Sequence, residues 1–377
     1  SAMRWFESIR PSNILKRHAR PILVRVASTS DRRKGTAAAQ SSRMLRPRFA
    51  RLALLGALVA WLGVGSAGPA LAADAAAPDD AANGYSRAQA LFHDRKFEQA
   101  IVALDAFLAA NPRHARAWVL RGDAEADLGQ NEPALKDYNV AIGIAPEYQY
   151  AYVTRCETRL QLDDTTGALA DCDTAVRLDP TDALAYEDRG DVQFQREAYD
   201  LALADYDKAI ENGRSSAYVF AARCDTERLV GKRDRARTDC EKALAFDPKS
   251  RRGLWARARL AIAEVRYVDG IADLNAYIVQ NPKASDTAYY FRGLAYNRIM
   301  SYRRALDDLR TYVQRQPSDA DGYKERAVAS YGLGDKDGAL ADLETAQRAY
   351  RKAANAAQVE RVAAMVRAIA AGKPPQP

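Results

Sequence analysis

The sequence predicts an all-α protein, an α-solenoid of eight helix-turn-helix repeats closed by one capping helix. Apolar residues recur at every third or fourth position, which is the period of an amphipathic helix. This pattern repeats every 34 residues, and a proline or an Asn-Gly pair ends most of the copies. Because one pair of short helices cannot bury its apolar stripe alone, the copies are expected to stack in one elongated array.

The N-terminal residues differ in charge from the rest of the chain. The 377 residues carry a net charge of +7, but residues 1–73 carry +11 and the remainder −4. Nucleic-acid binding is not expected, because it needs a basic face on the folded part. Residues 1–43, rich in Arg and Ser, are interpreted as a disordered basic extension.

Residues 44–72 have the pattern of a secretory signal peptide. After Met44, three arginines precede the apolar run Leu52–Val64, and small residues follow up to Ala72. We expect cleavage after Ala72, which predicts a periplasmic or secreted protein of the bacterial envelope. The alternative is an uncleaved membrane anchor, since the uncharged stretch is long enough to span a bilayer. Whether the natural chain starts at Met3 or Met44 stays open.

Residues 73–83 are expected to be a polar linker, and residues 84–353 to hold the helical repeats. The first positions of the eight repeats are Ala81, Ala115, Gln149, Ala183, Ala217, Arg251, Asp286 and Ala320. Proline ends the second helix in six repeats, because it disfavours helix in the preceding residue and donates no backbone hydrogen bond. In repeat four Asn212-Gly213 is expected to end that helix, since glycine adopts the left-handed conformation easily.

Residues 354–371 are expected to form the capping helix and residues 372–377 a tail. Repeat eight lacks the closing proline, so its second helix is expected to run on toward Asn355. The capping helix would cover the apolar face of the last repeat. Its apolar residues recur at three- and four-residue spacing: Val359, Val362, Ala363, Val366 and Ile369.

The repeat has a recognisable pattern of residue types. Position 4 is aromatic, position 8 is small, positions 20 and 27 are alanine, and position 32 is proline. This pattern, seen for example at Tyr152, Ala168 and Pro180, resembles the tetratricopeptide repeat family over residues 81–353. The resemblance implies a right-handed superhelix in which the first helices line a concave groove that binds protein partners.

The four cysteines occupy the same two repeat positions. Cys156 and Cys172 stand at positions 8 and 24 of repeat three, and Cys224 and Cys240 at the same positions of repeat five. In an antiparallel helix pair that turns near position 16, these positions face each other. We therefore predict the disulfides Cys156–Cys172 and Cys224–Cys240, which an oxidising envelope would maintain. The alternative is four small buried thiols. No metal site is predicted.

Position 7 is arginine in every repeat, and position 23 is aspartate in repeats two to eight. We interpret them as an internal ladder of Arg–Asp pairs, within or between repeats, because an arginine fork fits a carboxylate. The alternative is a row of arginines that binds an anion. The predicted ladder consists of Arg121, Arg155, Arg189, Arg223, Arg257, Arg292 and Arg326 with Asp137, Asp171, Asp205, Asp239, Asp273, Asp308 and Asp342.

The resemblance places positions 2, 5, 6, 9, 12 and 13 in the groove. The groove would be acidic in its first half and aromatic with basic residues in its second half, where Arg and aromatic residues suit a protein interface. The alternatives are a solvated face for the acids, and packing between repeats for Trp255 and Tyr290. The candidate groove residues are Asp123, Asp127, Glu157, Glu187, Asp188, Asp191, Asp225, Arg252, Trp255, Arg259, Tyr290, Phe291 and Arg298.

The functional prediction is a non-enzymatic scaffold without cofactor that holds an extended segment of a protein partner. No Gly-rich phosphate loop, nucleophile elbow or zinc-binding HExxH motif occurs in the sequence. Two alternatives are kept open. One is a scaffold for exopolysaccharide assembly or export, because aromatic groove residues also suit sugar rings. The other is a thiol-redox protein that uses the cysteines. A membrane contact is expected only through an uncleaved leader.

Overall fold

The computed structural model describes residues 79–280 and 286–375. Within these ranges all regular structure is helical, with seventeen helices and no strand. None of the described helices is both long and apolar enough to cross a membrane. The expected extension at 1–43, the leader at 44–72 and residues 73–78 of the linker lie outside the described residues.

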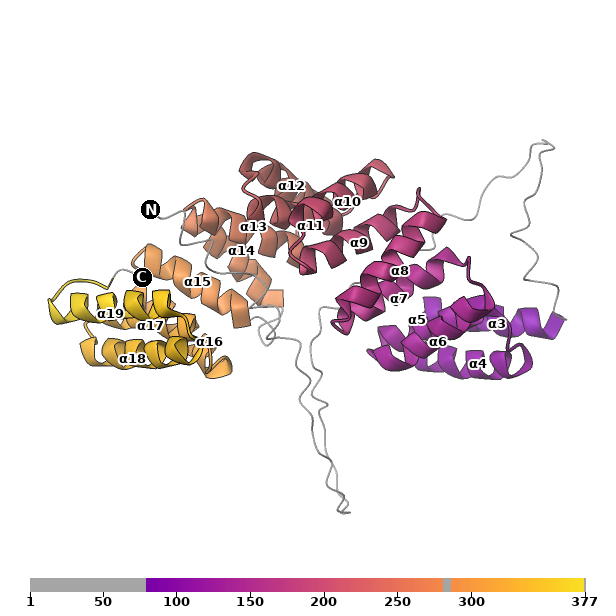
Figure 1. Cartoon of the computed structure of the whole chain (residues 1–377), viewed down its shortest axis with the longest axis horizontal. Helices are drawn as coiled ribbons and strands as arrows, with labels where there is room; N and C mark the ends of the chain where they lie inside the picture. Colours follow the sequence, from indigo (N-terminus) through magenta and orange to yellow (C-terminus); the bar gives the residue numbers. More distant parts are fainter. Residues whose placement is uncertain (1–78, 281–285, 376–377) are drawn as a thin grey trace, which may run out of the picture. The chain divides into compact units, whose positions relative to one another are not determined.

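Helices α3 to α18 alternate as first and second helices of eight repeats, drawn in chain order in Figure 1. The first helices are α3 (Asp79–His93), α5 (Ala115–Asp127), α7 (Gln149–Gln161), α9 (Ala183–Gln195), α11 (Ala217–Leu229), α13 (Arg251–Ala263), α15 (Asp286–Arg298) and α17 (Ala320–Gly332). The second helices are α4 (Phe97–Ala110), α6 (Asn131–Ile144), α8 (Thr165–Leu178), α10 (Tyr199–Glu211), α12 (Arg233–Phe246), α14 (Tyr267–Gln280), α16 (Tyr302–Arg315) and α18 (Lys336–Lys352). The predicted all-α repeat solenoid is confirmed, and a final helix, α19 (Ala356–Ala370), follows the repeats.

Residue contacts divide the chain into two compact parts. The N-terminal part ends at Val192 and the C-terminal part begins at Gln193, so the boundary lies inside α9. Within a part, the two helices of a repeat pack against each other, as α17 and α18 do in Figure 1. Second helices also contact the first helix of the next repeat, as α6 contacts α7 and α12 contacts α13. Each helix therefore buries its apolar stripe between neighbours.

The turn between the two helices has the same backbone in every repeat. Position 15 is left-handed in all eight repeats, with φ between 58° and 87°. Glycine takes this conformation at three of these positions without steric cost. Val265 and Met300 take it as well, although the left-handed region costs an ordinary residue about 1 to 2 kcal/mol. The turn is thus imposed by the packing of the two helices, because the local sequence of several repeats does not favour it.

Helix α3 begins earlier than expected, whereas helix α18 ends close to its expected end. Helix α3 begins at Asp79, so the last five residues of the expected linker belong to the first helix instead. This stretch contains Ala81 and Ala82, and alanine is the best helix former. Helix α18 does continue beyond the usual end and stops at Lys352, after which Ala354 is left-handed. In repeat four, Gly213 has φ 93° directly after α10, as expected.

Helix α19 covers the last repeat as the capping helix was expected to do. It buries Val362, Met365 and Ile369, which form one cluster with Leu343 and Tyr350 of α18. Val359 and Val366 of the predicted stripe are only partly buried against this cluster. Met365 was not part of the predicted stripe, although it lies three residues after Val362.

Positions 8 and 24 face each other across a repeat, and their side chains are complementary in size. A Cβ atom added to Gly122 would lie only 2.6 Å from the ring of Tyr138, so the close approach requires glycine. A Cβ atom added to Gly293 would likewise lie 2.7 Å from Leu309. Each of these contacts is made by one small and one large residue. They hold the two helices of a repeat together at their centres.

In repeats three and five a disulfide occupies this central contact. Cys156 is bonded to Cys172 with Cα atoms 5.6 Å apart, and Cys224 to Cys240 with Cα atoms 5.4 Å apart. The structure therefore contains both predicted pairs, and no free cysteine occurs in the described residues. All four cysteines are fully buried.

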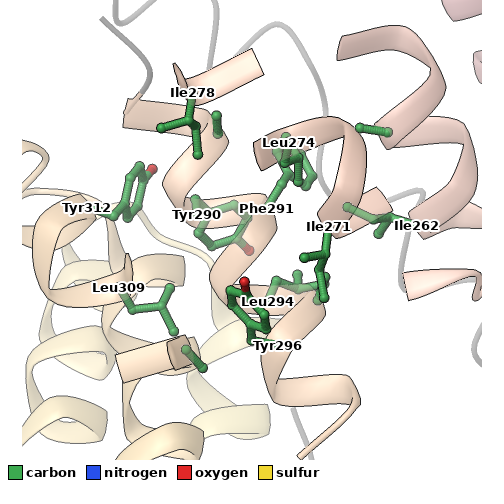
Figure 2. Packing of buried hydrophobic residues seen from close by; sticks show 14 of the residues in the cluster. Ile262, Ile271, Leu274, Ile278, Tyr290, Phe291, Leu294, Tyr296, Leu309 and Tyr312 are labelled. Atoms are coloured by element: carbon green, nitrogen blue, oxygen red, sulfur yellow. The ribbon is translucent and has the colours of Figure 1, made fainter. Parts of the chain in front are cut away.

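The largest apolar cluster lies in the C-terminal part, between repeats six and seven. Figure 2 shows Tyr290 and Phe291 of α15 at its centre, between Leu274 of α14 and Leu309 of α16. Trp255 of α13 packs against the same cluster and is partly buried. Burial of these aromatic and aliphatic side chains stabilises the contact between repeats six and seven.

The contribution of the disulfides is testable with a substitution that keeps the packing. Ala88 and Leu104 are buried at positions 8 and 24 of repeat one. In a variant with Cys156→Ala, Cys172→Leu, Cys224→Ala and Cys240→Leu, we expect a loss of about 3 kcal/mol per disulfide, because the unfolded loops are no longer closed. Urea unfolding of the full chain measures this. A reductant should destabilise the wild type and leave the variant unchanged; an unchanged wild type would show that the cross-links contribute nothing.

Candidate functional site

The arginines at position 7 form forked bonds with the aspartates at position 23. In Arg121 the Nε and Nη2 atoms donate to the two carboxylate oxygens of Asp137 over 2.7 and 2.8 Å. These bonds raise the pKa of Arg121 above its ordinary value. The same two-bond pairing joins Arg155–Asp171, Arg223–Asp239, Arg257–Asp273, Arg292–Asp308 and Arg326–Asp342. Arg189 and Asp205 belong to the two different compact parts of the chain.

The third nitrogen of the same arginine reaches the preceding repeat. Nη1 of Arg121 donates to Asp105 over 2.5 Å, and Nη1 of Arg155 donates to Asn139 over 2.7 Å. The corresponding pairs are Arg189–Asp173, Arg223–Asp207 and Arg292–Asn275. The acceptor always comes from position 25 of the preceding repeat. We call the forked pair, with this third contact where it forms, the arginine bridge; the third contact joins two consecutive repeats as well as the two helices of one repeat.

An aromatic ring at position 4 covers the arginine bridge. The guanidinium of Arg121 lies 4.6 Å from the ring centre of Trp118, and that of Arg326 lies 5.2 Å from Tyr323. Repeat six has Leu254 at this position, and the side chain of its Arg257 is 40% exposed, compared with 12–25% in the other bridges. The aromatic residue at position 4 therefore shields the ion pair from water, which strengthens it.

Two glutamates at position 11 place a further carboxyl group next to the aspartate of an arginine bridge. Burial, and then the charge of Asp137, raise the pKa of Glu125 to about 7. Burial, and then the charge of Asp239, raise the pKa of Glu227 to about 7. The carboxyl group of Glu227 is fully buried, with Nε of Arg235 2.8 Å away. Repeat three has Arg159 at this position, which instead donates a third hydrogen bond to the bridging aspartate.

The acidic groove candidates do not form an open face. Five of them, Asp123, Glu157, Glu187, Asp188 and Asp191, are at most 7% exposed, so the solvated-face alternative is wrong for them and a partner could not reach them directly. Asp127 is half-buried. The side chains are buried because first helices of neighbouring repeats touch, as α5 and α7 do.

Asp123 shows what such a buried acid does. Its two carboxylate oxygens accept hydrogen bonds from the hydroxyl groups of Tyr138 in the same repeat and Tyr150 in the next, over 2.9 and 3.0 Å. Asp123 therefore serves the contact between repeats two and three. The sequence does not reveal this role, because an aspartate on a first helix has the same pattern whether it faces water or a tyrosine of the next repeat.

Tyr290 and Phe291 do not lie in an open groove either. They are 2% and 7% exposed and belong to the apolar cluster of Figure 2, so they pack the core and do not contact a partner in the groove. Trp255 is partly buried, with ring centres of Tyr277 and Phe291 5.4 and 5.6 Å away. Tyr290 thus packs between repeats, as the alternative predicted, and the ring of Trp255 also contacts the core. In repeat six, position 4 is Leu254, which is buried in the same cluster.

The basic groove candidates remain partly accessible. Arg252 is half-buried and stacks over the ring of Tyr218 at 4.1 Å. Arg298 is 20% exposed and forms two hydrogen bonds with the buried carboxylate of Glu325, over 3.1 and 3.2 Å. Arg259 is 14% exposed and shares Asp225 with Arg228. The structure therefore brings Asp225, Arg252 and Arg259 together in repeats five and six.

Arg228 is the groove residue that the sequence analysis missed. It lies at position 12 of repeat five, one of the positions assigned to the groove, but only acids were considered there. Its Nε atom donates to Asp225 over 2.9 Å. The signal was available, because an aspartate and an arginine three residues apart lie on one face of a helix.

The arginine bridge predicts a measurable coupling. In double-mutant cycles with Arg→Gln and Asp→Asn, we expect Arg121 and Asp137 to couple by about 1 to 3 kcal/mol, because the pair is buried, forked and ring-covered. The matched control is Arg257 with Asp273, which lacks the ring and is more exposed; its coupling should stay below about 1 kcal/mol. The measurement is denaturant unfolding of the full chain. Equal couplings for both pairs would refute the role of the aromatic cover.

The glutamates predict a dependence of stability on pH. The folded-state pKa of Glu227 lies above the unfolded value of 4.5, so its contribution is fully present below about pH 4.5 and is lost as the pH rises through 7. The neutral variant Glu227→Gln should therefore gain stability relative to wild type between pH 5 and pH 8, by about 1 to 3 kcal/mol. Urea unfolding at the two pH values measures this, and Glu125→Gln repeats the test in another repeat. An identical difference at both pH values would contradict it.

Comparisons with known proteins agree with the repeat structure. A tetratricopeptide repeat family model matches residues 85–148, 157–217 and 292–357, together about half of the chain. No curated protein sequence matches the chain.

Solved structures show the same fold. The APC/C hetero-tetramer Cut9–Hcn1 gives a TM-score of 0.59 at 14% identity, over 73% of this chain and 54% of that one, so the chain spans about half the length of this relative. PilW, a widely conserved type IV pilus biogenesis factor, gives 0.50 at 17% identity over 55% of this chain and 97% of its own.

At these identities the structural matches show the fold alone. The family model, however, matches residue patterns across the array, and the eight repeats reproduce its helix-turn-helix unit. The chain belongs to the tetratricopeptide repeat family.

Proposed function

We propose that the protein is a non-enzymatic scaffold of the bacterial envelope that binds an extended segment of a protein partner along its first helices. Tetratricopeptide repeats generally bind proteins, which supports the coarse assignment. One observation supports the more specific proposal of a groove that binds an extended segment. Among the candidate groove residues, those that stay partly exposed and carry positive charge lie in repeats six and seven, at Arg252, Arg259 and Arg298.

The envelope assignment is supported by two independent features. The first is the sequence pattern of residues 44–72, which is typical of a secretory leader. The second is the pair of disulfides, because such bonds persist in oxidising compartments and are rare in the cytosol. The sulfur atoms are fully buried within their repeats, which fits a structural role and gives no support to thiol-redox chemistry.

A polysaccharide ligand is not supported by the site. Binding of a sugar ring would need an aromatic face open to solvent. Trp255 is packed between Tyr277 and Phe291, and Tyr218 is stacked under Arg252. The proposal therefore stays with an extended protein segment.

The proposal is tested in two steps on the full chain produced in a bacterium. The intact mass of the envelope fraction should correspond to a chain beginning at Ala73, with four thiols that react with an alkylating reagent only after reduction. A chain found in the cytosol with four reactive thiols would refute the envelope assignment.

The second step is photo-cross-linking in cells. A benzophenone amino acid at position 252 should capture a contiguous segment of a partner protein, identified by mass spectrometry. The matched control places it at Arg310, which is exposed on the second helix α16. Capture at both positions, or at neither, would count against a groove that binds an extended segment.

A further inference from the structure

Two guanidinium groups share a single carboxylate between α11 and α13. Nε of Arg228 donates to Oδ1 of Asp225 over 2.9 Å, and Nη1 of Arg259 donates to Oδ2 over 3.0 Å. The three side chains are only 12–14% exposed. A third positive charge, Arg252, acts on the same carboxylate. Among the described residues, Asp225 is the only carboxylate that accepts a hydrogen bond from Arg228 or Arg259.

The electrostatics of the group reflect this surplus of positive charge. Burial would raise the pKa of Asp225, but the charges of Arg259 and Arg228 hold it below its ordinary value. Burial, and then the charge of Arg228, lower the pKa of Arg259 to about 10. Two nearly buried cations that share one anion repel each other, and the low local polarity strengthens that repulsion.

Most of the hydrogen-bond donors in this group are unused. A guanidinium carries five N–H donors, and within the described chain Arg259 donates a single hydrogen bond. Nη2 of Arg228 lies 2.8 Å from Asp225 without being directed at it, and it is buried with no hydrogen-bond partner. A buried donor without an acceptor is rare and destabilising. The other groove arginine, Arg298, has its own carboxylate, Glu325, and forms two bonds with it.

The position of Arg259 is fixed by its surroundings. Its guanidinium lies 5.6 Å from the ring centre of Trp255 and 5.8 Å from that of Phe291. Both rings belong to the packed core of repeats six and seven, so the charge is held in place before any ligand arrives. A fixed, partly exposed guanidinium with free donors is suited to bind a planar carboxylate.

We propose that Arg228 and Arg259 form a binding site for the carboxylate of an Asp or Glu side chain in the extended segment of the partner. This inference rests on the proposed function, which it deepens by naming the chemistry that the partner must carry. The ligand carboxylate supplies the second negative charge for the two guanidinium groups and accepts hydrogen bonds from the N–H groups of Arg259 that Asp225 leaves free.

The recessed position of the guanidinium groups favours a peptide over an acidic sugar. With 12–14% of the side chains exposed, the donors are reached by a carboxylate on a slender, flexible arm. A uronic acid carries its carboxylate directly on a bulky ring, which would meet the packed helices first.

The test uses the full chain and a capped Gly-Ser peptide with one central Glu, compared with the same peptide carrying Gln. Binding is measured by fluorescence polarisation at low salt. We expect the Glu peptide to bind at least about tenfold more tightly than the Gln peptide, the difference that one charge-assisted contact makes. Arg259→Gln should remove this preference. Arg310→Gln, on the second helix α16 and outside the groove, is the matched control and should leave it unchanged.

Asp225→Asn gives a prediction of opposite sign. Removing the shared carboxylate leaves both guanidinium groups without an anion, so the Glu peptide should bind more tightly than it does to wild type. If these residues only stabilised the fold, Asp225→Asn and Arg259→Gln would both weaken binding, and the proposal would fall. Should Arg259→Gln not fold, as judged by circular dichroism, Asp225→Asn still decides the question.

Competition experiments identify the ligand chemistry. Acetate should compete with the Glu peptide; stronger competition by phosphate or by an oligogalacturonide would overturn the assignment to an acidic side chain. A segment cross-linked at position 252 whose binding does not depend on its Asp or Glu residues would refute this site and leave the scaffold intact. Absence of any cross-linked segment would refute the scaffold itself.

Discussion

The structure depends on the arginine at position 7, because its side chain repeats the same ion pair along the array and, in several repeats, joins three helices. Its fork fixes the two helices of its own repeat through the aspartate at position 23, and in several repeats its remaining nitrogen fixes the second helix of the preceding repeat. A repeat array has only contacts between neighbours, so register must be set again at every step. A planar group with donors in fixed directions can do this, whereas apolar contacts allow sliding. The aromatic residue at position 4 and the acceptor at position 25 act on the same arginine: the ring covers its guanidinium, and the acceptor binds its third nitrogen.

Most of the fold could be predicted from the sequence because the repeat multiplies weak signals. One aromatic residue or one alanine means little, but eight copies in register define helices, turns and stacking. The disulfides were predictable for the same reason, since two pairs at the same repeat positions imply the same geometry. The turn backbone was not predictable: Val265 and Met300 are left-handed although their types disfavour it. At these residues the packing of two helices outweighs the local conformational preference, and the sequence of a single repeat does not reveal that packing.

The candidate site was less predictable, because burial within a groove is decided by the next repeat. Asp123 was expected on an open face and instead accepts hydrogen bonds from two tyrosines, one of them from the following repeat. Tyr290 was a candidate for the groove, with packing between repeats as the alternative, and it lies in the core. Arg228 was overlooked because its importance comes from Arg259, 31 residues later in the sequence. Pairs of this kind form only when first helices touch, and sequence periodicity does not report how closely they approach.

The placement of the two disulfides also determines how the array would respond to a pulling force. Each bond closes a loop inside one repeat, with a sequence separation of 16, and none crosses between repeats. If a repeat is pulled apart, the residues inside the loop cannot extend, which withholds about 55 Å of contour length at roughly 3.5 Å per residue. When they unfold, repeats three and five therefore extend less than repeats without a cross-link, which can extend along their whole length. Attached to a partner under tension, the chain would lengthen in unequal steps, and the bonded repeats would keep part of their chain compact throughout.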